Sequence, residues 1–160
     1  MAAIDDYINT IIDQGGHEAH ADGSATIEAH HLLLAIAANA DGAPQEVLAS
    51  VGLDHQAIRD ALDREFEHSL GAAGVFAAAF DLPQPSRAAK RPSQLGASAK
   101  LALERGFRSV SRKKHLRPTH LLLGIVRAKV GTVPRALTLA GVDQADLMVR
   151  ALQTLPDKGE

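Results

Sequence analysis

Eight histidines are the side chains in this sequence best suited to ligate a metal. His17 and His20 are spaced to place two imidazoles on one face of a helix, and His30 and His31 follow nearby. The sequence has no cysteine and no H-E-x-x-H pattern that would complete a recognisable zinc site. The favoured interpretation makes His31 and His120 core or capping residues and the others solvated, so that neither a metal nor another cofactor is expected.

The hydroxyl and carboxyl side chains predict no catalytic centre. No serine lies in a G-x-S-x-G turn, and the absence of cysteine excludes a thiolate nucleophile. Asp60 and Glu67 are expected on an exposed helix, where a solvated face is a better interpretation than general acid and base catalysis. No G-x-x-x-x-G-K-[ST] loop is present to cradle nucleotide phosphates. We therefore expect a protein that is not an enzyme.

A cluster of basic residues is the strongest charged feature of the sequence: Arg108, Arg112, Lys113, Lys114 and Arg117. Such a cluster can grip the phosphates of nucleic acid or an acidic protein, or it can form a solvated loop facing the acidic part of the chain. No aromatic residue is interleaved within it, and no known nucleic-acid motif surrounds it. Protein partners therefore rank ahead of nucleic acid.

Composition and charge set the class of the protein. Apolar residues make up 46% of the chain but aromatic residues only 3%, which predicts a helical core of Leu, Ile, Val and Ala. Residues 1–86 hold two basic and fourteen acidic side chains, a net charge of −12, whereas residues 87–160 hold fifteen basic and five acidic ones, a net charge of +10. No secretory signal and no apolar run of membrane-spanning length is visible, so a cytoplasmic protein without a membrane partner is expected.

One segment of the sequence occurs twice. Residues 31–36 recur as residues 120–125, at an offset of 89 residues. The same offset pairs Leu48 with Leu137 and Gly52 with Gly141. Each copy is therefore expected to contain the same succession of helices.

The apolar pattern predicts four helices in each copy. The first begins near Ile4 and is weakened or ended by Gly15 and Gly16. Proline, aspartate and glycine at helix ends set the other boundaries. In the first copy the remaining helices are expected at 28–40, at 44–51 and after a cap at Asp54. In the second copy the four helices are expected at 95–110, 119–130, 133–140 and 143–155.

The predicted organisation is one all-α domain over residues 1–160. Two tandem, pseudo-symmetric four-helix repeats, 4–69 and 93–155, are joined by an extended linker over 70–92 that is rich in Ala, Gly and Pro. Phe76 and Phe80 lie one helical turn apart within this linker. We expect them either to cap the end of the fourth helix or complete the core, or to occupy the ligand groove at the seam between the repeats.

The doubled pattern resembles the Clp N-terminal domain, the double four-helix repeat of Clp-type unfoldases, especially of the ClpC kind. The family's G-T-E-H-[IL]-L-L-G-[LI] segment corresponds to residues 28–36 and 117–125. The resemblance is supported by the leucine-then-glycine pattern that precedes the fourth helix of each copy. The resemblance implies a recognition domain that binds Clp substrates, adaptors or the Clp ATPase itself, and in relatives also cyclic-peptide antibiotics. It covers most of the chain, but the ATPase modules of a complete unfoldase are absent from this sequence.

Departures from the family motif bear on the expected ligand. In ClpC-type domains the threonine and glutamate of G-T-E-H help to recognise phosphoarginine, and here these positions hold Ala29 and His30, then Pro118 and Thr119. Because a neutral side chain does not replace a carboxylate that pairs with a guanidinium, weak phosphoarginine binding is expected. The aromatic residue that the family often places before each first helix is replaced by Ile4 and Ser93.

The function predicted from these features is a non-enzymatic accessory of the Clp system that binds proteins or peptides as a decoy or an adaptor. The candidate ligand-binding residues are Ile4, His30, Phe76, Phe80, Ser93 and Thr119. The alternative is a nucleic-acid-binding or regulatory protein that uses the basic second repeat.

Overall fold

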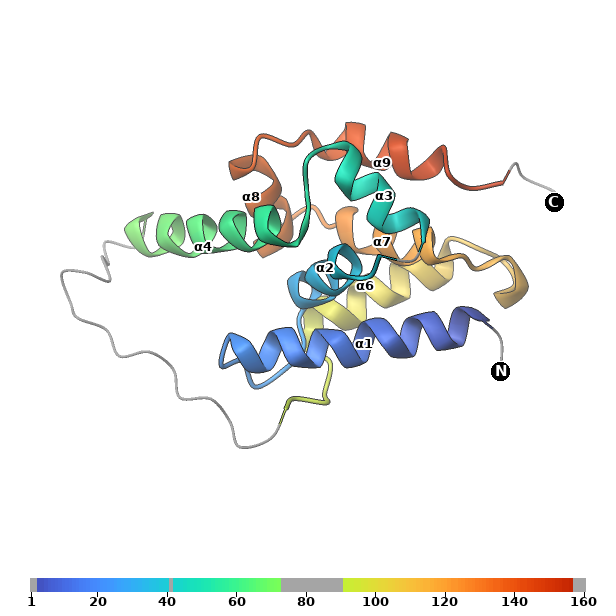
Figure 1. The fold of residues 1–160 in the computed structure, drawn as a ribbon, viewed down its shortest axis with the longest axis horizontal. Helices are drawn as coiled ribbons and strands as arrows, with labels where there is room; N and C mark the ends of the chain where they lie inside the picture. The colour runs from blue at the N-terminus through green and yellow to red at the C-terminus, as the bar shows by residue number, and fades with distance from the viewer. Residues whose placement is uncertain (1–2, 41, 73–90, 157–160) are drawn as a thin grey trace.

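The structure, a computed structural model, describes residues 3–40, 42–72 and 91–156. The regular secondary structure of this part of the chain is helical, apart from one isolated parallel bridge between Ile27 and Leu95. The elements in chain order are α1 (Ala3–Ala21), α2 (Ala29–Ala38), α3 (Ala43–Ser50), α4 (His55–Ala72), α6 (Ala97–Arg108), the 3-10 turn η1 (Lys113–His115), α7 (Pro118–Val126), α8 (Thr132–Leu139) and α9 (Gln144–Leu152) (Figure 1). The predicted all-α fold class is confirmed.

In both copies a glycine ends the third helix and an aspartate caps the start of the fourth helix. Gly52 and Gly141 have φ angles of 79° and 76°, in the left-handed region that glycine adopts after a helix. Asp54 and Asp143 then each accept a backbone N–H of the next helix, at 2.7 and 2.9 Å. These predicted capping residues are confirmed.

The first helix is longer than the sequence suggested. α1 continues through Gly15 and Gly16, both of them buried, although this pair was expected to weaken or end it. A Cβ on Gly16 would lie 2.9 Å from the carbonyl oxygen of Pro92, so glycine here lets the chain entering the second repeat pass against α1. α4 likewise continues to Ala72, beyond the predicted start of the linker at residue 70.

A single hydrophobic core runs through both copies, and α2 and α7 are buried on nearly every side. Figure 1 places these two helices between α1 and α6 on one side and α3, α8 and α9 on the other. The core is aliphatic, as the composition predicted. The two phenylalanines in the described ranges, Phe66 and Phe107, are 59% and 45% exposed.

Outer helices of each copy pack against helices of the other copy across this core. α4 of the first copy packs along α8 of the second, while α9 of the second packs on α3 of the first. Glu65 on α4 receives a hydrogen bond from Arg135 on α8 at 2.8 Å. The seam between the copies is therefore a continuous packed interface.

Candidate functional site

A pocket of ≈ 480 Å³ lies between the first turn of α1 and the segment that leads into α7. Its walls combine apolar side chains with cations, and the lining residues are Ala3, Ile4, Leu116 and Pro118 together with Lys113, Lys114 and Arg117. Leu116 is buried, whereas the three cations are exposed. The pocket therefore offers an apolar floor with positive charge at its rim.

Polar contacts position the cationic wall of this pocket. Lys113 begins the η1 turn, and its Nζ reaches across to Asp5 on α1 at 2.8 Å. Arg117 stands immediately before α7, and one nitrogen of its guanidinium donates to the carbonyl oxygen of Lys114 at 3.0 Å. The first repeat and the second repeat thus each contribute one side of the pocket, and the Asp5–Lys113 pair joins them.

The repeat has a second place equivalent to this pocket, between the start of α6 and the segment that leads into α2, and there the described residues leave no pocket open. By the offset of 89 residues, Glu28 corresponds to Arg117 and Gly96 to Tyr7. The backbone pairs there through Ile27, which donates to the carbonyl oxygen of Gln94 at 2.9 Å and accepts the N–H of Gly96 at 2.8 Å. We call this the closed junction, and the pocket at Ile4 the open junction.

The side chain of Glu28 fills the closed junction. A Cβ on Gly96 would collide with its carboxylate, which accepts hydrogen bonds from Thr26 and, at 2.7 Å, from Ser98. Burial opposes ionisation, but these hydrogen bonds hold the pKa of Glu28 below its usual value. Glu28 is thus an ionised internal occupant of the closed junction.

The predicted ligand-binding residues fall in different surroundings. Ile4 lines the open junction, and Ser93, its counterpart, is exposed beside the closed one. Thr119 is only 2% exposed, and its hydroxyl lies 2.9 Å from that of Thr154. Phe76 and Phe80 lie outside the described residues.

The basic cluster is only partly gathered at the pocket. Lys113, Lys114 and Arg117 line it, whereas Arg108 and Arg112 do not, although both are exposed. The sequence reasoning treated Ile4 and the basic cluster as separate features. The structure makes Ile4 and three members of the cluster one site.

Two histidines close the first turns of the central helices. Nδ1 of His31 accepts the backbone N–H of Glu28, and Nδ1 of His120 accepts that of Arg117, both at 2.9 Å. Both rings are buried. The interpretation of His31 and His120 as core or capping residues is confirmed, whereas the expectation that the other histidines are solvated is wrong for His30, whose burial lowers its pKa.

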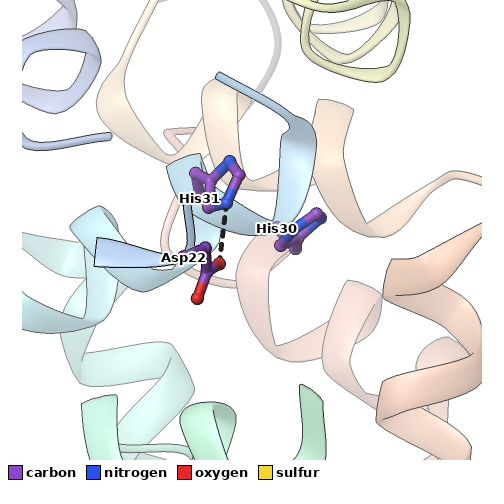
Figure 2. Close-up of side chains that lie close together, drawn as sticks. All are labelled: Asp22, His30 and His31. Carbon is purple, nitrogen blue, oxygen red and sulfur yellow. Dashed lines mark hydrogen bonds and ion pairs between the residues drawn. The ribbon is translucent and has the colours of Figure 1, made fainter. Parts of the chain in front are cut away.

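Within the described ranges, Asp22, His30 and His31 are the group of metal-ligating side chain types whose ligand atoms lie within 4.8 Å of one another. Nε2 of His31 lies 2.9 Å from Asp22 Oδ2 (Figure 2). Because Nδ1 of His31 already accepts a backbone N–H, Nε2 carries the ring proton and donates it to Asp22. The His31 ring therefore has no free lone pair for a metal, and His31 and Asp22 form a hydrogen-bonded pair beside His30.

An ion network extends from this group to α4. Arg59 donates to Asp22 at 2.6 Å and to Glu18 at 2.8 Å, and His55 Nε2 lies 2.6 Å from the other oxygen of Glu18. The side chains of Glu18 and Arg59 are only 10% and 21% exposed. This network ties the end of α1 to the start of α4. Among the described residues of the second copy this network has no equivalent, because Met148 stands where the first copy has Arg59.

His30 supplies a test by pH. Burial, reinforced by the neighbouring His31, lowers the pKa of His30 from 6.5 to about 4. At a pH between these two values, His30 is protonated in the unfolded chain but stays neutral in the folded chain. The free energy of unfolding therefore falls as the pH drops from 6.5 to about 4. We expect this residue to account for a loss of about 2 kcal/mol.

Urea denaturation of the wild type and a His30→Gln variant, at neutral pH and near pH 4.5, measures this contribution. The carboxylates with lowered pKa, such as Asp22 and Glu28, destabilise both proteins in acid. The loss of unfolding free energy in acid that the wild type shows beyond the His30→Gln variant is therefore the contribution of His30. Parallel acid losses in the two proteins would show that His30 titrates normally.

Glu28 is the residue of this region that the sequence reasoning missed. Its position in the repeat, paired with Arg117 by the same offset that identified the copies, was the available signal. The opposite charges at these paired positions indicate that the two junctions differ.

Comparison with known proteins places most of the chain in one family. A family model described as the Clp repeat (R) N-terminal domain matches residues 4–111. A search of curated proteins finds no match. In the described ranges, no helix combines the length and apolar character needed to cross a membrane.

Proposed function

The chain belongs to the Clp repeat N-terminal domain family, and from this premise we propose that it is a non-enzymatic module that binds proteins or peptides for the Clp unfoldase–protease system. The proposal includes a ClpC-type relationship. The observation that carries it is the open junction, where Ile4 and Leu116 provide an apolar floor beside exposed cations. An apolar pocket with a few convergent polar groups is the usual form of a binding site.

Two modes of action fit this site. A decoy would hold substrates or adaptors away from the Clp ATPase, and an adaptor would deliver them. Both need a surface that recognises proteins, and neither needs chemistry within this chain. The Clp ATPase itself and cyclic peptides are further candidate ligands through the family relationship.

Capture followed by a degradation assay tests the proposal. The immobilised wild-type chain is expected to retain Clp substrates, adaptors or the ATPase from a lysate, whereas an Ile4→Glu variant, which places a charge in the pocket, is expected to lose them. In a reconstituted Clp degradation reaction, the added chain slows proteolysis if it is a decoy and speeds it if it is an adaptor. An unchanged rate, with the same proteins captured by both chains, would contradict the proposal.

Nucleic acid binding is the alternative, and the exposed side chains of Arg108 and Arg112 are the observation in its favour. Titration with DNA and RNA at physiological salt separates the two functions. The nearby Phe107 is 45% exposed and is the only phenylalanine, tyrosine or tryptophan between residues 97 and 118 on which a base could stack. We therefore expect weak binding to nucleic acid.

A further inference from the structure

The open junction has two cationic side chains, Lys114 and Arg117, that form no ion pair with a described acidic residue. Lys113 is already paired with Asp5 at 2.8 Å. Lys114 and Arg117 line the same pocket, are exposed, and make no ion pair with any described residue. The bond from Arg117 to the carbonyl oxygen of Lys114 holds the guanidinium near the rim and leaves its remaining N–H groups for a ligand.

The surroundings add to this positive charge. Residues 108–117 contain five basic and no acidic side chains. The acidic side chains on the facing first turn of α1 are Asp5, which Lys113 neutralises, and Asp6, which is exposed. The local excess of positive charge attracts an anionic group.

The floor of the pocket determines what accompanies that anionic group. Ile4 and Leu116, with Ala3 and Pro118, form an apolar surface directly beside the cations. A phosphate or a carboxylate alone would leave this surface in water. A protein segment that carries an aliphatic side chain next to a carboxylate would cover both surfaces.

The closed junction limits binding to one site in each chain. There Glu28, at the position of Arg117, already occupies the equivalent space and satisfies its carboxylate with two hydroxyl groups. A carboxylate arriving from a partner would meet an ionised carboxylate instead of a guanidinium.

We propose that the open junction binds an acidic segment of a partner protein, with carboxylates on Lys114 and Arg117 and an aliphatic side chain against Ile4, at one site in each chain. This inference rests on the proposed function, because it assigns the ligand class of the same protein-binding surface.

Fluorescence anisotropy with two labelled peptides tests the proposal. In the first peptide Asp alternates with Leu, and in the second Asn replaces Asp. The wild-type chain is expected to bind the acidic peptide with one-to-one stoichiometry, with an affinity that falls as salt is raised, and to bind the Asn peptide about tenfold more weakly or not at all.

A matched pair of variants separates the local effect from that of net charge. Lys114→Glu with Arg117→Glu is expected to weaken binding of the acidic peptide by about tenfold or more. Lys100→Glu with Lys129→Glu changes the net charge equally but alters exposed residues outside the pocket, so it should weaken binding much less. Circular dichroism melts of all the proteins confirm that they remain folded.

Several results would overturn the proposal. These are equal binding of the two peptides, equal losses in the two double variants, a stoichiometry of two, or tighter binding of a DNA or RNA oligonucleotide that displaces the peptide. Sedimentation that shows dimers broken by Lys114→Glu and Arg117→Glu would instead assign the pocket to the acidic first repeat of a second copy. Capture of Clp proteins that persists in this double variant would refute the acidic ligand while leaving the proposed function intact.

Discussion

Replacing Arg59 with methionine, the residue at the equivalent position of the second repeat, is expected to lower the free energy of unfolding by about 3–4 kcal/mol. Arg59 bridges Glu18 and Asp22, and the Glu18 side chain is only 10% exposed. Methionine leaves two carboxylates close together with no guanidinium between them. The cost is that of two partly buried carboxylates left with only their histidine partners, His31 and His55, and urea denaturation at neutral pH measures it.

A triple variant identifies the cause of this loss. Glu18→Gln and Asp22→Asn, combined with Arg59→Met, remove the stranded charges while keeping the shapes of the side chains. We expect the triple variant to recover part of the stability that Arg59→Met alone loses. If the single and triple variants were equally unstable, lost packing of the arginine stem would be the explanation instead.

Gly124→Ala is expected to destabilise the chain by about 3 kcal/mol, although alanine favours helices over glycine. A Cβ at this position would collide with the carbonyl oxygen of Ala102 and lie 2.8 Å from the backbone nitrogen of Gly106. Both atoms belong to the backbone of α6 and cannot move independently. Helices α6 and α7 would have to separate, and thermal and urea denaturation would report the loss.

The first repeat provides the control for this prediction. Ala35 is the counterpart of Gly124 and is fully buried in α2 without requiring glycine. Ala35→Gly should therefore cost only about 1 kcal/mol, through the greater freedom of glycine in the unfolded chain. A Gly124→Ala protein as stable as the wild type would mean that α6 and α7 lie farther apart than described.

Most of the helices could be predicted because their signals are local. Asp54 and Asp143 mark helix starts, Gly52 and Gly141 mark helix ends, and the doubled leucine-rich segment marks the two central helices. Each signal acts within a few residues, so one sequence carries it.

The remaining features depend on contacts between distant parts of the chain. The Gly15–Gly16 pair suggested a helix end, but Gly16 is required by the close approach of Pro92. The pocket likewise needs Ile4 to meet Lys113 and its neighbours, which no local pattern predicts. The offset between the copies could have paired Glu28 with Arg117, but only the packed helix ends show that one junction is filled and the other open.

The exchanged packing of the outer helices has a thermodynamic consequence. Because α4 packs along α8 and α9 packs on α3, neither copy keeps a complete core when the other unfolds. The domain should therefore lose its structure in one cooperative step, without an intermediate in which one repeat is folded. A ligand that binds only the native open junction adds its binding free energy to the stability of that whole unit, so it also slows any hydrogen exchange at the distant closed junction that requires global unfolding.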